Sequence, residues 1–320
     1  MKKNFRLHSS NGILRSYCIL KSDDHGNIEL STAKPIRGTY IEPDPMGLFM
    51  TVERTDDVSY GDMVKNYEAE PFYYSLRLFS ESEELLDEVN LKKRWHHPLV
   101  AEIEVKQGGI WGVIYKPPGP GSFPCIIDTP VVDGRLCKTH APLSASEGFL
   151  SFCFPMLDEP RLPKTLEDVD IEYLSKHIKY VQSLPYCSDN IGLYGISFAG
   201  LIAHHLATKH PELKVVATTN GPGAFYRRLR PETSIKWENI STNIPFRVLS
   251  SIDDWLVDGV TNGAYIRDSL LKTEHKVEIE FVNSGHVTVI PYNPHHNFGF
   301  NKFVNVNLGF GGETSTHGKV

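Results

Sequence analysis

The chain has little cysteine and no long apolar run. Its five cysteines are odd in number, scattered and without the spacing of a metal site, so we expect reduced thiols, no metal ion and no other cofactor. No segment is apolar over the length that spans a bilayer. The basic first eight residues have no apolar segment behind them, so we expect no secretory leader and a cytoplasmic protein. The cysteines are Cys18, Cys125, Cys137, Cys153 and Cys187.

An excess of positive charge is missing as well. Lysine and arginine number 33 against 39 aspartates and glutamates, which gives a formal net charge of -6 at pH 7. A nucleic-acid binder needs a basic face to neutralise phosphates, so this class is excluded. The 320 residues are 40% hydrophobic and 22% charged, which is typical of a folded protein with material for about two domains. No internal repeat interrupts this composition.

The first third of the chain has the pattern of short β-strands separated by turns. No long segment of helical periodicity intervenes, and the spacing predicts a β-sandwich of about a hundred residues. The acidic stretch 81–88 is interpreted as a solvated loop or a short helix. The segment 116–124, rich in proline and glycine, places the domain boundary, so we expect one domain over 1–116 and a second over 117–320. The predicted strands are 13–20, 38–41, 47–52, 73–79, 100–105 and 110–115.

After this boundary, strands alternate with helices, which predicts a mostly parallel sheet covered on both faces. Apolar runs predict the strands. A helix that follows the capping box at 165–168 and ends near 183–185 is indicated by Ile171, Leu174, Ile178 and Val181 on one face. The order of elements fits an α/β-hydrolase sheet. The predicted strands are 125–128, 149–154, 191–196, 213–219, 246–251 and 276–282, and further helices are expected near 140–146, 198–209 and 259–271.

One strand runs directly into a turn of small residues with a serine at its tip. Residues 191–200 read IGLYGISFAG, and Gly195, Ser197 and Ala199 match the nucleophile elbow G-x-S-x-G except that alanine replaces the last glycine. A strained, tight turn exposes the serine hydroxyl only if its neighbours two residues away are small. A serine hydroxyl is nearly inert at neutral pH, so the motif predicts a histidine base and a carboxylate further along the chain. The bare motif also fits a chance turn.

Candidate partners for Ser197 follow two later strands. Asp253 and Asp254 come directly after strand 246–251, and His286 follows strand 276–282. In this type of sheet, catalytic groups gather at the carboxyl ends of the strands, and the chain order serine, aspartate, histidine is the one the fold uses. An aspartate after a strand is also a common turn residue, so the choice of carboxylate stays open. His204 and His205, in the helix behind the elbow, are interpreted as packing or surface residues rather than catalytic ones.

These segments resemble the acyl-CoA thioesterase and bile acid-CoA:amino acid N-acyltransferase family over nearly the whole chain. The family pairs an immunoglobulin-like N-terminal domain with an α/β-hydrolase domain. The resemblance implies that Ser197 is the nucleophile, His286 the base and Asp254 the acid that orients it, with Asp253 as the alternative acid. It is carried by 38–48 (GTYIEPDPMGL), 117–124 (PPGPGSFP), 157–164 (LDEPRLPK), 192–197 (GLYGIS), 220–222 (NGP), Asp253-Asp254, Gly285-His286 and 311–313 (GGE).

The resemblance also implies the reaction. It predicts hydrolysis of an acyl-CoA substrate through an acyl-serine, with the backbone N–H groups of Phe198 and Val131 as oxyanion donors. Within the family, serine rather than cysteine as nucleophile favours hydrolysis. Two alternatives remain: acyl transfer to an amino acid such as glycine or taurine, and a member that only binds acyl-CoA. The binding-only alternative is motivated by residues 129–135 (TPVVDGR). The family's loop there is glycine-rich and supplies an oxyanion donor, whereas Pro130 has no N–H.

Overall fold

The chain folds into two compact units in the computed structural model, which describes residues 2–9, 12–54, 69–157, 162–165, 168–223, 235–288, 298–301 and 306–313. One unit is built from both ends of the chain, and the other from its middle. The first comprises Met1–Lys65, Glu70–Arg94 and Asn283–Val320, and the second comprises Asn66–Ala69 and Trp95–Val282.

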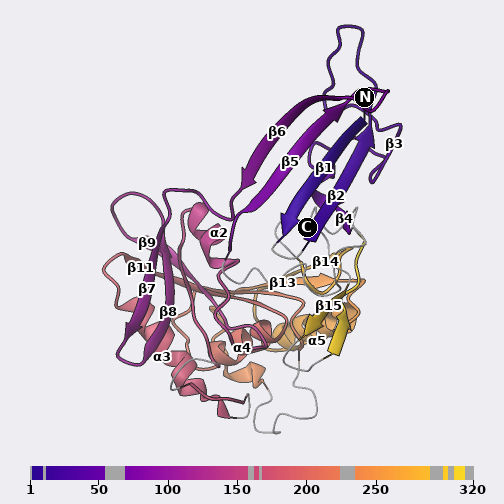
Figure 1. Ribbon diagram of the computed structural model, residues 1–320. Helices are drawn as coiled ribbons and strands as arrows, with labels where there is room; N and C mark the ends of the chain where they lie inside the picture. The colour runs from indigo at the N-terminus through magenta and orange to yellow at the C-terminus, as the bar shows by residue number, and fades with distance from the viewer. Residues whose placement is uncertain are drawn as a thin grey trace. The chain divides into compact units, whose positions relative to one another are not determined.

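The first unit contains an antiparallel sheet whose strands run in the order β3-β2-β1-β5-β6, with β4 paired to β2 (Figure 1). Alternate residues of β2 face one side, where Leu14 and Cys18 pack against Tyr74 of β5. A hairpin of β15 and β16 belongs to the same unit. The elements are β1 Lys2–Ser9, β2 Gly12–Ile19, β3 Arg37–Gly38, α1 Gly47–Met50, β4 Glu53–Arg54, β5 Phe72–Phe79, β6 Leu85–Lys93, β15 Phe298–Asn301 and β16 Val306–Gly309.

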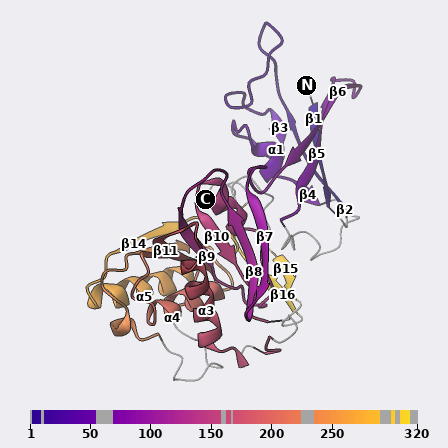
Figure 2. The ribbon, with the colours of Figure 1, turned by 90° about the vertical axis from the view of Figure 1, so that its left-hand side faces the viewer.

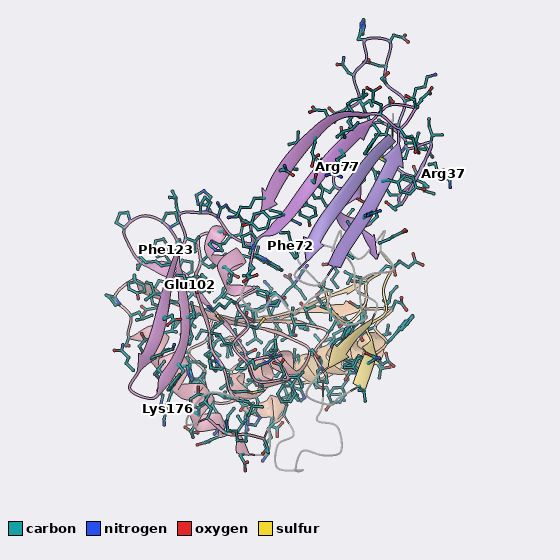
Figure 3. The ribbon with its side chains drawn as sticks, viewed as in Figure 1. Arg37, Phe72, Arg77, Glu102, Phe123 and Lys176 are labelled. Carbon is teal, nitrogen blue, oxygen red and sulfur yellow. The ribbon has the colours of Figure 1, made fainter. Side chains whose placement is uncertain are left out.

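Two predictions for this unit were wrong. The segment 47–52 begins with helix α1 rather than a strand, and its Leu48 side chain is buried in the core beside the sheet. The acidic stretch 81–88 is partly strand β6, because an edge strand has both faces in water and tolerates charge. Arg77 on β5 (Figure 3) donates to Glu88 on β6 across this pair at 3.2 Å. The described residues before Arg94 form one six-stranded sheet, so the immunoglobulin-like sandwich stays a prediction.

The second unit is built on an eight-stranded sheet in the order β14-β13-β12-β11-β9-β10-β8-β7. From β10 to β14 neighbouring strands are parallel, whereas β8 is antiparallel to both β7 and β10. This mixed sheet confirms the predicted α/β-hydrolase fold. Its strands are β7 Ala101–Gln107, β8 Ile110–Lys116, β9 Phe123–Asp128, β10 Leu150–Cys153, β11 Cys187–Ile196, β12 Val215–Thr219, β13 Phe246–Ser251 and β14 Val277–Val282.

Strands β7 and β8 correct the sequence analysis, which assigned 100–105 and 110–115 to the N-terminal sandwich. The two strands form a hairpin, and β8 pairs with β10, so both belong to the sheet of the second unit. The compact units accordingly part between Arg94 and Trp95. A hairpin's local pattern is the same in a sandwich and at the edge of a mixed sheet, so the sequence pattern did not distinguish the two.

Helices cover both faces of the sheet. Figure 2 shows α3, α4 and α5 side by side on one face. In β10, Phe152 packs in the large core with residues of α3 and α4, whereas its neighbour Cys153 packs with Ala141 and Ala145 of α2. Because successive strand side chains point to opposite faces, α2 covers the other face. The helices are α2 Ala141–Ser146, α3 Ile171–Gln182, α4 Phe198–Ala207, α5 Gly259–Lys272 and the 3-10 turn Trp237–Asn239.

Candidate active site

Ser197 is the single residue between β11 and helix α4. Its backbone has φ 56° and ψ -127°, a region that side chains with a Cβ rarely adopt. The turn is held by its own backbone, since the Ser197 N–H donates to Thr219 O at 2.9 Å and Gly200 N–H donates to Ser197 O at 2.9 Å. The residues predicted to form a strand, a sharp turn and a helix do so, and the nucleophile elbow geometry is present.

The small residues around Ser197 are required by space. A Cβ at Gly195 would lie 2.4 Å from the carbonyl carbon of Ala199, closer than real Cβ contacts allow. A Cβ at Gly200 would lie 3.2 Å from the Cα of Gly221, where α4 passes the loop after β12. Ala199 is buried in the same turn. Its methyl group is accommodated, so the departure from the usual second glycine does not prevent the elbow.

Asp253 and Asp254 lie in the loop after β13 and make different contacts. The Asp254 Oδ1 accepts from two backbone groups, Leu256 N–H and Val257 N–H, both at 2.8 Å. The Asp253 Oδ1 instead accepts from the indole Nε1 of Trp255 at 2.8 Å. Two backbone donors on one oxygen fix the position of the Asp254 carboxylate. Asp253 is tied to a side chain that is itself 58% exposed.

His286 belongs to the unit that contains the N-terminal sheet. Its side chain is buried and stacks on Phe310, with ring centroids 6.2 Å apart and an interplanar angle of 18°. The His286 N–H donates to Phe310 O at 2.6 Å, and a Cβ at Gly285 would lie 2.2 Å from Gly311 O. The glycine is therefore needed where the two segments touch. Since Ser197 lies in the other unit, the meeting of His286 with Ser197 stays a prediction.

The loop after β9 is well anchored. Thr129 is buried, and its N–H donates to Tyr194 O at 2.9 Å. Val131 O accepts from Gly134 N–H at 2.8 Å, which closes a turn, and Gly134 has φ +69° with Leu157 Cγ 2.3 Å from where a Cβ would be. The ends of β9, β11 and β13 lie at one edge of the sheet because these strands are parallel. Val131, Ser197 and Asp254 therefore follow strands that end at this edge.

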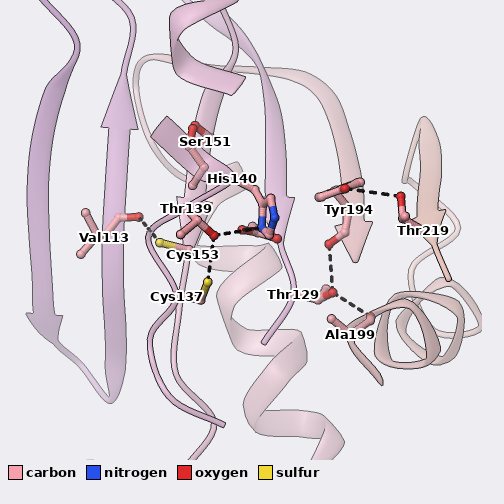
Figure 4. A network of polar contacts seen from close by, with 12 residues as sticks. Val113, Thr129, Cys137, Thr139, His140, Ser151, Cys153, Tyr194, Ala199 and Thr219 are labelled. Atoms are coloured by element: carbon pink, nitrogen blue, oxygen red, sulfur yellow. Dashed lines mark hydrogen bonds and ion pairs between the residues drawn. The ribbon is translucent and has the colours of Figure 1, made fainter. Parts of the chain in front are cut away.

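A polar cluster behind this loop was missed by the sequence analysis. Asp128, the last residue of β9, lies 3.5 Å from the Nδ1 of His140, and Thr139 links His140 to the thiol of Cys137 (Figure 4). Burial, together with the Asp128 charge, raises the pKa of Cys137 to about 12, so the thiol stays protonated. The one sequence signal was an aspartate at the end of a buried strand. His140 also contacts the ring of Tyr194, 5.7 Å between centroids.

Several other predicted features can be placed. His204 is fully buried between Trp237 and Phe246, so the packing role is confirmed. All five cysteines lack disulfide bonds. Among the described residues, no group of histidine, cysteine and acidic side chains could hold a metal ion. Nor do the described helices include one that is long and apolar enough to cross a membrane.

Two family models match the chain. "Acyl-CoA thioester hydrolase/BAAT N-terminal region" matches residues 3–107, and "BAAT / Acyl-CoA thioester hydrolase C terminal" matches 169–230 and 224–320. Rat acyl-coenzyme A thioesterase 1 (Rattus norvegicus) is 25% identical over 95% of this chain and 82% of its own length. The mouse (Mus musculus) acyl-coenzyme A thioesterase 1 and peroxisomal succinyl-coenzyme A thioesterase are 28% and 26% identical over 65% of this chain. Those matches span only about half of each mouse protein, 51% and 50%.

Solved structures with a similar chain path are more distant. A putative dienelactone hydrolase from Klebsiella pneumoniae has a TM-score of 0.46 and 17% identity, over 57% of this chain and 84% of its own. The acylaminoacyl peptidase of Pyrococcus horikoshii has a TM-score of 0.46 and 13% identity, over 88% of this chain and 49% of its own. The assignment of the chain to a family therefore rests on the sequence matches. Because the two family models together cover most of its length, the chain belongs to the acyl-CoA thioester hydrolase/BAAT family.

Proposed function

We propose that this protein is an acyl-CoA thioesterase with Ser197 as its nucleophile. The observation that carries the proposal is the backbone of Ser197, held at φ 56° between a central strand and a buried helix. Such a conformation is costly, and strained residues of this kind cluster at functional sites. The names of the curated relatives support acyl-CoA as the substrate class.

The proposed reaction uses the Ser197 hydroxyl and the His286 imidazole. His286 takes the Ser197 hydroxyl proton as the oxygen attacks the thioester carbonyl. The C–S bond breaks, and the CoA thiolate leaves and receives that proton from His286. Water then attacks the acyl-serine ester, giving its proton to His286, which returns it to Ser197 as the fatty acid departs. Thiolate is a good leaving group, so the acid step is less demanding than in amide cleavage.

Charge stabilisation falls to the Asp254 carboxylate and to two backbone N–H groups. Asp254, fixed by two backbone donors, orients the imidazole and stabilises its protonated form. The two oxyanion donors are the N–H groups of Phe198 and Val131. Phe198 is the first residue of α4, and the N–H groups of a helix's first turn have no partner within the helix. Val131 lies in the loop after β9. Asp253, bound to an exposed indole, is the less constrained carboxylate.

The first experiment compares CoA release by the purified chain and by Ser197→Ala, over a panel of acyl-CoAs from succinyl to long chains. We expect the purified chain to release CoA and Ser197→Ala to release none. Ser151→Ala is the matched control because Ser151 is a buried strand serine outside the site, whose hydroxyl donates to Ala141 O. Full release by Ser197→Ala, with both variants folded, would refute the proposal.

The same assay separates hydrolysis from conjugation. Glycine or taurine is added, and the products are analysed by mass spectrometry. We expect free fatty acid in both conditions, because serine is the nucleophile. An N-acyl amino acid as the main product would assign the chain to acyl transfer instead.

The cytoplasm is our proposed location. The relatives include proteins named peroxisomal and mitochondrial, so the location of this chain needs its own measurement. Imaging of the full-length protein with a small internal tag decides between a diffuse and an organellar signal.

A further inference from the structure

Thr129 joins two elements that the proposed reaction needs at a fixed separation. It is the first residue after β9, and 3% of its surface is exposed. Its hydroxyl lies 2.9 Å from Tyr194 O on β11 and 2.8 Å from Ala199 O in the first turn of α4. Figure 4 shows Thr129 between these two residues. The hydroxyl has one hydrogen, which it donates to one of these carbonyls at a time or shares between them. Because the Thr129 N–H already bonds to Tyr194 O, a hydroxyl that donates to Ala199 O connects the strand and the helix that flank Ser197.

The bond to Ala199 is additional to those that the helix itself provides. A carbonyl oxygen has two lone pairs, so Ala199 O can serve its helix and still accept from Thr129. The contact to Tyr194 O repeats one that the Thr129 N–H already makes. Neither carbonyl therefore depends on the hydroxyl for a partner. What the hydroxyl adds is a direct connection between the loop after β9 and the start of α4.

The next residue makes this connection stiffer. Pro130 has a fixed φ, and a residue before proline is confined to extended backbone, which continues the direction of β9. Three residues beyond Val131, Gly134 closes the loop, and its carbonyl accepts from Met156 N–H and Leu157 N–H at 2.8 and 2.9 Å. The segment from Thr129 to Gly134 is therefore held at both ends.

We infer that Thr129 is a positioning residue whose hydroxyl holds the loop after β9, which carries Val131, against the nucleophile elbow. The inference rests on the proposed function. The two oxyanion donors, Phe198 N–H and Val131 N–H, lie on segments that follow different strands, so their separation depends on a contact between the segments. Donors fixed before the reaction stabilise the developing charge without reorganisation. Thr129 supplies this contact from a buried position.

The test is Thr129→Val, which keeps the branched shape and removes the hydroxyl. Both carbonyls keep another donor, so we expect the variant to fold. We expect kcat to fall by roughly 10-fold to 100-fold, below the loss for removing a whole donor, with KM changed by less than about threefold. Thr129→Ser restores the hydroxyl and should recover kcat to within about threefold of the starting protein. Ser151→Ala, which loses a buried hydroxyl outside the site, should keep kcat.

Labelling of Ser197 by a fluorophosphonate gives a second readout. The adduct places an oxygen among the same donors, so the labelling rate of Thr129→Val should fall with its kcat. Unchanged kcat and labelling in Thr129→Val would overturn the inference, as would equal losses in Thr129→Ser and Thr129→Val. If Thr129→Val does not fold, Thr129→Ala replaces it as the variant without a hydroxyl. Its kcat and labelling rate should then lie below those of Thr129→Ser, and equal values in the two variants would overturn the inference.

The two proposals fail separately. Thioesterase activity that survives Ser197→Ala refutes the proposed function. Ser197-dependent activity that is indifferent to the Thr129 hydroxyl refutes only the inference. If no acyl-CoA is hydrolysed, the labelling rates of the Thr129 variants still decide the inference, because labelling requires an activated serine but no thioester.

Discussion

Replacement of Ser197 by glycine should make the protein more stable while abolishing its activity. A side chain at φ 56° and ψ -127° costs about 1–3 kcal/mol, and glycine, which has no Cβ, removes this cost. Glycine in turn loses about 0.5–1 kcal/mol through the greater freedom of the unfolded chain. Ser197 makes no capping hydrogen bond to α4, so no cap is lost. The difference of the two terms is a gain of about 0–2.5 kcal/mol, with a central value of about 1 kcal/mol.

Ser197→Ala is the matched control because it removes the hydroxyl and keeps the Cβ. We expect its free energy of unfolding to lie within about 0.5 kcal/mol of the starting protein. The assay is urea unfolding of the full chain, followed by circular dichroism, with the midpoints compared at equal slopes. Both variants should lose CoA release. A glycine variant no more stable than the alanine variant would refute the argument that the elbow stores strain.

Three further predictions concern single residues. Burial lowers the pKa of His204 to about 3, so the unfolded chain binds a proton that the folded chain does not; the stabilisation is complete above pH 6.5 and is lost as the pH falls towards 3. Urea unfolding should show that the free energy of unfolding falls by about 2 kcal/mol between pH 7 and 5, and that this fall is absent in His204→Leu. The same dependence on pH in both proteins would contradict this. Gly195→Ala, which drives a Cβ against Ala199, should reduce the free energy of unfolding by more than about 2 kcal/mol, and wild-type stability would contradict the close approach. Asp254→Asn should lower kcat by at least about 100-fold and Asp253→Asn by less than about threefold, measured by CoA release; the reverse order would assign the acid to Asp253.

The sequence predicted the nucleophile elbow and most of the sheet around it. Strand 246–251 was predicted with its observed bounds, and the helix expected from Ile171, Leu174, Ile178 and Val181 forms over Ile171–Gln182. These elements are determined by local signals, such as periodicity and the small residues beside Ser197. Each can be recognised without knowing what lies next to it in space.

What depends on contacts distant in sequence was not predictable. The sheet membership of β7 and β8 is decided by the pairing of β8 with β10, which no local pattern reveals. The bond from Thr129 to Ala199 links residues 70 positions apart, and a threonine before a proline otherwise indicates only an extended residue. His286 lies in a different compact unit from Ser197, so its role as base remains a prediction that kinetics must test.

The position of the β7–β8 hairpin determines where the chain can be divided. A fragment that starts after the proline-rich segment 116–124 would lack both strands, and β10 would become the edge of the sheet. All residues of β10 are buried, including Leu150 and Phe152. Such an edge is apolar, carries unpaired backbone groups and has no charged residue to block pairing with another chain. This fragment is expected to aggregate, and a cut at Arg94 avoids that by keeping the hairpin in place.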